Sequence, residues 1–253
     1  MSQTYDSSHY EKIDRIERRH FWFLNRSMLL EQVIRSYIPV PHNSSFLEVG
    51  FGTGIVLRLL DSMGFNTTGI DVNARALLYA KRKTHATLIR QSIYTCKAKQ
   101  HYDSVGAFDV MEHQVDDRKF LLCCKQLLKK NGYLFLTVPA GPYLWSQYDE
   151  LSGHKKRYTK PHINALVSSC GFHLDYCTYW QTFILPFYWL TRKFAHIAGQ
   201  KKDLMEHVYL KIPIQPLHFL LYALGWLEVK LLSYMSFPYG ASLVVVCRKK
   251  EGV

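Results

Sequence analysis

The sequence lacks the cysteine patterns that mark metal or redox proteins. It has six cysteines, none in a CxxC pair and none at a zinc-ligand spacing, so neither a zinc ribbon nor a dithiol redox motif is indicated. We therefore expect free thiols in a reducing cytoplasm. The cysteines are Cys96, Cys123, Cys124, Cys170, Cys177 and Cys247. The first 20 residues also lack the apolar segment of a signal peptide, and this favours a cytoplasmic location.

Long apolar runs are missing as well, which argues against a membrane-spanning helix, since a bilayer needs about 20 apolar residues. Residues 179–195 and 213–237 are the most apolar, and Glu228 and Lys230 interrupt the second. Trp, Tyr, Lys and Arg mixed with Leu are typical of an interfacial helix or of a cap around a lipid-like acceptor. Peripheral membrane association and a purely structural cap or dimer interface both remain open.

Acidic residues are scarce, with 20 Asp and Glu against 32 Lys and Arg, and the net charge is +12. Residues 154–253 carry 13 basic against 5 acidic residues, whereas residues 1–153 carry 19 against 15. The basic surplus indicates an anionic partner: a phosphate-bearing acceptor, a nucleic acid or an acidic membrane surface. A merely solvated basic surface fits the same numbers.

What the sequence does contain is an alternation of short apolar strands and amphipathic helices. Strands are expected at residues 45–50, 67–72, 87–91, 102–108, 133–138, 172–179 and 241–248, and helices at residues 9–37, 55–63, 73–83, 117–129 and 161–169. This order predicts an α/β fold with a doubly wound parallel sheet. Ligands of such sheets bind at the carboxyl ends of the strands. We expect one domain over residues 1–253.

The first strand runs directly into a glycine loop. Gly50, Gly52 and Gly54 let the backbone turn sharply and bring amide groups to a ligand, and the next helix adds its free N–H groups. The GxGxG spacing lacks the third glycine of the dinucleotide fingerprint. Glu48 lies two positions before the first glycine, where it would suit a cationic amino group rather than a pyrophosphate.

Asp71 ends the second strand, 17 residues after Gly54. A carboxylate there can accept hydrogen bonds from both hydroxyls of a ribose, and Val72 follows it beside the same ligand. Together with the glycine loop it favours an adenosyl ligand. A glycine-rich turn with a helix-capping aspartate is the alternative.

These motifs resemble those of class I S-adenosylmethionine-dependent methyltransferases. The loop residues 46–54 (FLEVGFGTG) and residues 69–72 (GIDV) look like motifs one and two of that class. Residues 102–113 (YDSVGAFDVMEH) with Asp116 and Asp117, and residues 131–139 (NGYLFLTVP), resemble the ubiquinone/menaquinone-methyltransferase-like branch. The family resemblance is to methyltransferases of type 11/23.

A narrower resemblance covers nearly the whole chain. Residues 17–26, 145–158 and 237–240 are similar to a bacterial subgroup of this family. The resemblance implies a Rossmann-like seven-stranded sheet of order 3-2-1-4-5-7-6 and S-adenosyl-L-methionine as the methyl donor. One departure is Gln91-Ser92, which stands where the family has an acidic residue near the adenine; Ser92 could still hydrogen-bond the ring.

Methyl transfer from a sulfonium needs an oriented acceptor and exclusion of water, and only sometimes a base. The end of the fourth strand supplies Asp109 and Met111, which would border the cofactor. Glu112 and His113 follow, and either could bond to the acceptor or hold the loop. No metal site of recognisable spacing is present, although Glu112-His113 leaves that option open.

Residues 145–158 form the second segment expected near the acceptor, because they follow the fifth strand. His154 is the best candidate base, since its ordinary pKa lies near neutrality; pairing with Asp149 to hold the loop is the rival role. Arg157 and Tyr158 complete the candidate catalytic set. The cations Lys155, Lys156, Arg157 and Lys160 would suit an anionic acceptor, or form a solvated loop.

Two further segments should frame the site: an N-terminal helical lid at residues 9–37 and an aromatic insert or cap at residues 181–235. We expect an enzyme that methylates an oxygen or nitrogen of a bulky acceptor, lipid- or glycan-linked. An RNA or protein methyltransferase is the alternative enzyme, although no Asn-Pro-Pro-Tyr-type motif follows the fourth strand. A cofactor-binding module without catalysis is the third hypothesis.

Overall fold

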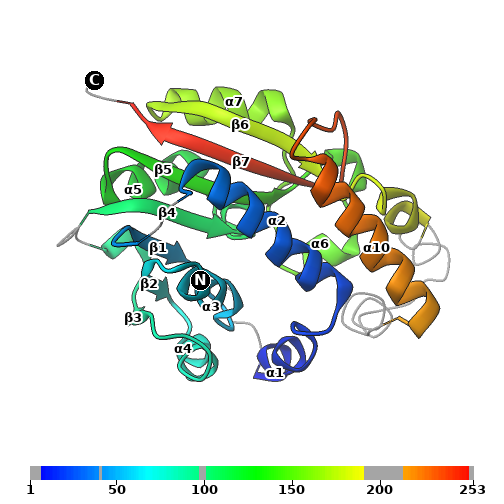
Figure 1. Ribbon diagram of the computed structural model, residues 1–253. Helices are drawn as coiled ribbons and strands as arrows, with labels where there is room; N and C mark the ends of the chain where they lie inside the picture. The colour runs from blue at the N-terminus through cyan, green and yellow to red at the C-terminus, as the bar shows by residue number, and fades with distance from the viewer. Residues whose placement is uncertain (1–6, 40–41, 97–100, 191–212, 251–253) are drawn as a thin grey trace.

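The computed structural model describes residues 7–39, 42–96, 101–190 and 213–250 (Figure 1). Its strands form one sheet of order β3-β2-β1-β4-β5-β7-β6. The strands are β1 (Ser45–Val49), β2 (Asn66–Asp71), β3 (Thr87–Arg90), β4 (Tyr102–Phe108), β5 (Leu128–Pro139), β6 (Phe172–Trp180) and β7 (Ser242–Lys249). The first five run parallel and β7 is antiparallel to both of its neighbours. The predicted seven-stranded order is confirmed.

Helices cover both faces of this sheet (Figure 1). On one face lie α5 (Asp117–Leu127) and α7 (Lys160–Ser169), which bury Phe120 and Ile163 against Val105. On the other lie α2 (Phe21–Tyr37), α3 (Ile55–Met63) and α10 (Gln215–Leu231). Buried apolar side chains on both faces explain why the strand sequences read as nearly continuous apolar runs.

The helix α10 packs closely along α2 (Figure 1). Gly225 makes this possible, since a Cβ there would lie 2.0 Å from Asn25 Nδ2. Two bonds join the pair: the Asn25 amide donates to the carbonyl of Leu221 and the Gln32 amide donates to that of Val229. The described part of the aromatic insert therefore packs against the N-terminal helix α2.

Several element boundaries differ from the sequence prediction, and two of these differences are described here because their cause is clear. The helix expected at residues 9–37 is two helices, α1 (Ser7–Ile16) and α2, because His20 adopts an extended conformation and caps α2 through a bond from Trp22 N to its Nδ1. The helix expected to reach Lys129 ends at Leu127, and Leu128 already begins β5. The structure also contains α4 (Ala74–Ala80), α6 (Gln147–Leu151) and the 3₁₀ helices η1 (Ile93–Thr95), η2 (Met111–His113) and η3 (Pro142–Leu144).

The part of the insert at residues 191–212 lies outside the described residues. Within the described ranges, none of the helices is both long enough and apolar enough to span a bilayer.

Candidate active site

The glycine loop joins β1 to α3 with three left-handed residues. Gly50, Gly52 and Gly54 have φ values of 74°, 53° and 84°, which other residues adopt only at a cost. A Cβ on Gly50 would lie 2.7 Å from Val110, and one on Gly54 would lie 2.7 Å from Ala80. A Cβ on Gly52 would meet nothing within 4 Å, so the space beside this residue is open to a ligand.

Asp71 at the end of β2 is bound to this loop. Its Oδ2 accepts a hydrogen bond from Gly52 N at 3.0 Å and its Oδ1 accepts one from Asn73 N at 2.8 Å. Burial raises the pKa of this carboxyl. A carboxylate offers about four lone-pair sites, so acceptor capacity remains for a ribose hydroxyl. Val72 beside it is 53% exposed, so its side chain is accessible to a ligand.

Glu48 faces the helix α2 from the middle of the sheet. It is buried, and its Oε2 has no hydrogen-bond partner among the described residues. Burial raises its pKa to about 8, Arg26 counteracts this, and Asp71 adds to it. A buried carboxyl with an unused oxygen fits a ligand that brings a positive charge, such as the ammonium and sulfonium groups of S-adenosylmethionine.

Arg26 of α2 closes this end of the site. Its guanidinium lies 2.8 Å from Asp109 Oδ2 and donates to the carbonyl of Phe108 at 3.1 Å. Asp109 has a φ of 59°, a left-handed conformation that is uncommon outside glycine and often found at functional sites. The predicted cofactor residues Glu48, Gly50 and Asp109 are therefore brought to one place at the carboxyl ends of β1 and β4.

A second contact attaches the N-terminal helices to the glycine loop. Glu17 is buried and accepts a hydrogen bond from Thr53 Oγ1 within the loop, and it forms an ion pair with Lys83. Tyr10 of α1 stacks on Tyr79 of α4 with ring centroids 6.1 Å apart. The helices α1 and α2 thus lie over the β1 and β2 end of the site. Thr53 and Lys83 were not foreseen, and Lys83 belongs to no sequence motif.

Two predicted cofactor residues are less accessible to a ligand. Met111 is fully buried in the core, so it can border the loop but offers no exposed surface to a ligand. Ser92 caps η1, with its hydroxyl accepting from Tyr94 N at 3.3 Å. Ser92 is only half buried, so its hydroxyl can still reach an adenine.

The loop after β5 is organised around Asp149, which is fully buried. Its Oδ1 accepts hydrogen bonds from His154 Nδ1 and Arg157 Nε, both at 2.8 Å, and its Oδ2 accepts one from Ser146 N at 3.0 Å. Arg157 also donates to the carbonyl of Ala140. Asp149 and Arg157 therefore shape the loop and set the orientation of the His154 ring.

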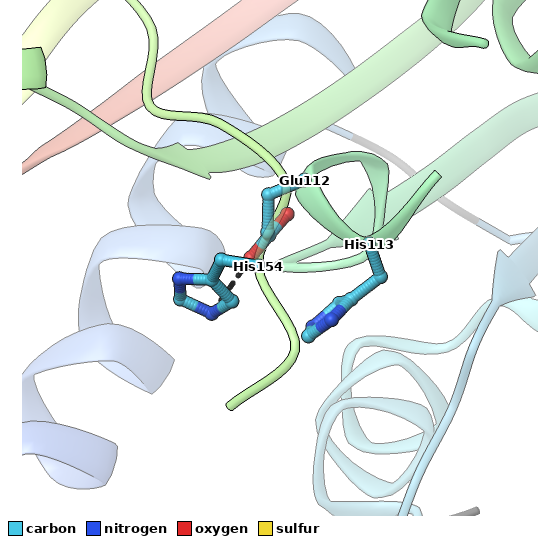
Figure 2. A group of neighbouring side chains, drawn as sticks. All are labelled: Glu112, His113 and His154. Carbon is cyan, nitrogen blue, oxygen red and sulfur yellow. Dashed lines mark ion pairs between the residues drawn. The ribbon is translucent and has the colours of Figure 1, made fainter. Parts of the chain in front are cut away.

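This loop meets the end of β4 at η2 (Figure 2). Lys155 N donates to the carbonyl of Glu112 at 2.7 Å, and the rings of His113 and His154 lie 5.0 Å apart. Burial raises the pKa of Glu112 well above its usual range, and the charge of Asp109 adds to this. Burial, and secondly His154, lowers the pKa of His113 to about 4. His113 is therefore neutral at physiological pH.

Tyr158, another candidate catalytic residue, lies in the hydrophobic core. Tyr158 is fully buried and stacks on His162 with centroids 5.6 Å apart. Burial raises the pKa of Tyr158, and the negative charges of Asp117 and Glu112 raise it further. Of the cations expected to attract an anionic acceptor, Lys156 pairs with Asp117 and Lys160 donates to the carbonyl of Phe237.

An apolar cluster lies where the start of α2, the chain after β5 and the insert meet. Its buried members are Phe21, Leu144, Ile184, Tyr188, Leu221 and Ala241. The bond from Phe21 N to His218 Nε2, at 3.0 Å, ties the start of α2 to α10. Apolar side chains thus converge on the loop that follows β5.

The fold, the glycine loop and the acidic residues at the ends of β1 and β2 define a Rossmann-like protein that binds an adenosyl ligand. A family model described as a methyltransferase domain matches residues 14–176. The chain therefore belongs to this methyltransferase family, and its cofactor is S-adenosyl-L-methionine. The open space at Gly52, the unused oxygen of Glu48 and the remaining acceptor capacity of Asp71 fit that cofactor.

Curated relatives indicate which branch of the methyltransferase family the chain is similar to. The chain is 32% identical over 125 residues to the ubiquinone biosynthesis O-methyltransferase of Glaesserella parasuis, covering 44% of this chain and 53% of that protein. It is 32% identical over 102 residues to the mitochondrial ubiquinone biosynthesis O-methyltransferase of Bos taurus, covering 36% of this chain and 28% of that protein. The aligned part spans about half or less of these relatives.

Solved structures agree on the fold. An S-adenosylmethionine-dependent methyltransferase from Mesorhizobium loti is 14% identical with a TM-score of 0.57, over 86% of this chain and 96% of that one. The [4+2]-cyclase SpnF is 16% identical with a TM-score of 0.56, over 88% and 80%. Since a cyclase shares the architecture, the fold alone does not fix the reaction.

Proposed function

We propose that this protein transfers a methyl group from S-adenosylmethionine to an oxygen of a bulky, apolar, lipid- or glycan-linked acceptor. The proposal is supported by the gathering of Glu48, Asp71 and the glycine loop at adjacent strand ends, and by a buried apolar cluster that includes Leu144 after β5. Glu48, Asp71 and the glycine loop would hold the donor at the carboxyl ends of β1 and β2. The apolar cluster around Phe21 and Tyr188 would hold the apolar part of the acceptor.

The chemistry required of the chain is modest, because the sulfonium of the cofactor is already activated. The protein must align the acceptor oxygen with the methyl group and exclude water. The helices α1 and α2 act as a lid in this proposal. Arg26 faces Asp109 and Glu48, so in the ligand complex its guanidinium would turn to the carboxylate of the methionine moiety.

Oxygen is favoured over nitrogen as the acceptor atom because the similar curated proteins are named O-methyltransferases. In this proposal His154 accepts the hydroxyl proton. The bond between its Nδ1 and Asp149 supports this role because it fixes the ring, with Nε2 3.9 Å from Glu112 Oε1. The Asp149–His154 pair resembles the oriented histidine that serves as a base in other enzymes. His154→Ala should lower turnover at least about 100-fold if this role is correct.

We also propose that the protein acts at an anionic membrane surface. One face of α10 exposes Phe219 (70%), Leu220 (53%), Trp226 (44%) and Leu227 (43%). Lys230 lies over the ring of Trp226 at 5.9 Å, and the net charge of the chain is +12. A helix that joins an exposed aromatic and aliphatic face to basic charge suits the boundary of an anionic bilayer.

Flotation with vesicles tests the membrane proposal. Wild-type protein should float with vesicles that contain phosphatidylserine, and Phe219→Ser with Leu220→Ser should reduce the floated fraction severalfold. Val115→Ser, which removes an 87% exposed apolar side chain elsewhere, should leave it unchanged. Equal flotation of all three proteins, or of none, would contradict a role for this face.

Radioactive methyl transfer tests the catalytic proposal. Purified protein and methyl-labelled cofactor are incubated with total lipid extract and with the water-soluble fraction of the same cells. Label should enter the lipid extract in an alkali-stable ether linkage. Label that enters only RNA or protein would contradict the proposed lipid- or glycan-linked acceptor. An absence of label from every fraction would favour a cofactor-binding module without catalysis.

A further inference from the structure

Gln181 follows β6 in a backbone conformation that glutamine rarely adopts. Its φ is 65°, in the left-handed region that glycine reaches freely and that other residues adopt only at a cost in free energy. The helix α10 passes the end of β6 and fixes the chain there (Figure 1). The buried carboxylate of Glu228 accepts hydrogen bonds from Thr182 N at 2.8 Å and Phe183 N at 3.3 Å. A glycine would follow the same path without strain, which points to a use for the side chain of Gln181.

The side chain of Gln181 is buried and has an unused hydrogen-bond donor. The residue is 3% exposed, and its Nε2 has no hydrogen-bond partner among the described residues. A buried donor without a partner costs free energy, and such groups are rare in native proteins. A strained backbone and an unsatisfied amide at the same residue are together typical of a site that a ligand completes.

The sheet register places Gln181 at the edge where ligands of this fold bind. The strand β6 runs parallel to β5, because β7 between them is antiparallel to both, so the carboxyl ends of β4, β5 and β6 lie at one edge. Trp180, the last residue of β6, pairs with Ser242. Gln181 therefore comes level with Ala241, a member of the apolar cluster described above, and Ile184 of the same cluster follows three residues later.

We propose that Gln181 is a hydrogen-bond donor of the acceptor site and that it selects an uncharged lipid. Its Nε2 donates to a carbonyl, ether or hydroxyl oxygen of the acceptor, while the apolar cluster holds the apolar part of the same molecule. The inference rests on the proposed function, because it narrows a lipid- or glycan-linked acceptor to a neutral lipid with an oxygen next to its apolar part.

The charges near the end of β5 favour an uncharged acceptor over an anionic one. A buried anion needs a cation or several donors as partners, whereas one neutral amide satisfies a neutral oxygen. Of the four cations expected to attract an anion, Lys155 is exposed. The other three have partners within the protein: Lys156 has Asp117, Arg157 has Asp149 and Lys160 has the carbonyl of Phe237.

Lipid retention by the whole chain tests the inference without methyl transfer. Protein saturated with S-adenosylhomocysteine is equilibrated in detergent micelles with either the neutral or the acidic fraction of total cell lipids. The protein is then repurified, and its bound lipid is measured by mass spectrometry. Wild type should retain neutral lipid. Gln181→Met keeps the length of the side chain and removes the donor, so it should retain about three- to tenfold less, the loss expected for one hydrogen bond between uncharged groups.

Two glycine substitutions provide matched controls. Gln181→Gly removes the side chain and relieves the left-handed backbone, so retention of neutral lipid should fall as in Gln181→Met while affinity for S-adenosylhomocysteine stays at the wild-type value. Asn43→Gly makes a similar exchange at an exposed residue with a φ of 70° before β1, at the opposite edge of the sheet. It should leave lipid retention unchanged.

Equal retention of neutral lipid by wild type, Gln181→Met and Gln181→Gly would overturn the role of Gln181. Retention of the acidic fraction alone, or of neither fraction, would overturn the uncharged lipid acceptor. Retention of a neutral lipid that depends on Gln181, without methyl transfer to that lipid, would leave this binding site standing and overturn the proposed function instead.

Discussion

At the scale of single residues, the raised pKa of Glu48 has consequences for both stability and cofactor binding. The buried carboxyl shares its surroundings with Arg26 and Asp71, and burial raises its pKa to about 8. The folded, ligand-free protein therefore holds this proton more tightly than the unfolded chain does. Raising the pH from about 4.5 to about 8 thus costs stability through Glu48, because ionisation is easier in the unfolded chain.

The pKa of Glu48 predicts a pH dependence of cofactor binding. The ammonium group of the methionine moiety favours the ionised carboxyl, so affinity for S-adenosylhomocysteine should rise between about pH 6 and pH 8, by at most roughly tenfold per unit. Above that range the amino group of the ligand loses its own proton. Calorimetry over this pH range, in buffers of different ionisation enthalpy, should show proton release on binding.

Glu48→Gln is the control for this effect. The variant keeps the shape of the side chain and removes the titration, so its affinity should be lower and vary little below pH 7.5. A Glu48→Gln profile as steep as the wild-type profile would show that another group causes the dependence.

At the scale of elements, the N-terminal helices are fixed by a small buried ionic cluster. The side chains of Lys83 and Glu17 are 3% and 0% exposed, and Lys83 also pairs with Asp14. Removing one member of a buried pair leaves an uncompensated charge. The position of the N-terminal helices therefore depends on Lys83, which lies in the turn after α4.

Lys83→Met should destabilise the protein by roughly 3–5 kcal/mol, because the buried carboxylate of Glu17 then has no cation. Urea unfolding measures the loss, and adding Glu17→Gln to Lys83→Met should restore part of it. Lys129→Met breaks the exposed pair with Asp103, whose side chains are 49% and 35% exposed, and should cost at most about 1 kcal/mol. Equal losses in the two single variants would contradict the buried cluster.

Periodicity predicted the elements well where the apolar pattern was continuous, and less well at their ends. The strands β1, β2 and β4 were correct because apolar runs flanked by glycine or polar residues mark them clearly. The division of residues 9–37 was missed, since it depends on His20 acting as a cap. The early start of β5 was missed because Lys129 and Lys130 read as the end of a helix.

At the scale of the whole molecule, the sheet order gathers the predicted cofactor residues at adjacent strand ends. Glu48, Asp71 and Asp109 end β1, β2 and β4, which are neighbours in the sheet. This gathering could be predicted, because it follows from topology. The pairing of Glu112 with His154 and the anchoring of the lid by Lys83 could not, since both depend on loop paths that no periodic pattern specifies.

The sequence also predicted the cofactor better than the acceptor. The cofactor is held largely by backbone turns and strand-end carboxylates, and glycine spacing and Asp71 mark these in any chain of this fold. The proposed acceptor region consists of apolar side chains of α2, the chain after β5 and the insert, and their convergence depends on packing between distant segments.

The most direct test of the central claim is calorimetric titration with S-adenosylmethionine and S-adenosylhomocysteine. Wild-type protein should bind both with micromolar affinity. Gly52→Arg should abolish binding because its side chain would enter the open space beside the loop. Gly171→Arg, which places the same residue at a φ of 77° far from the site, should bind as wild type does. Binding by Gly52→Arg equal to wild type, or no binding by wild type, would contradict the account.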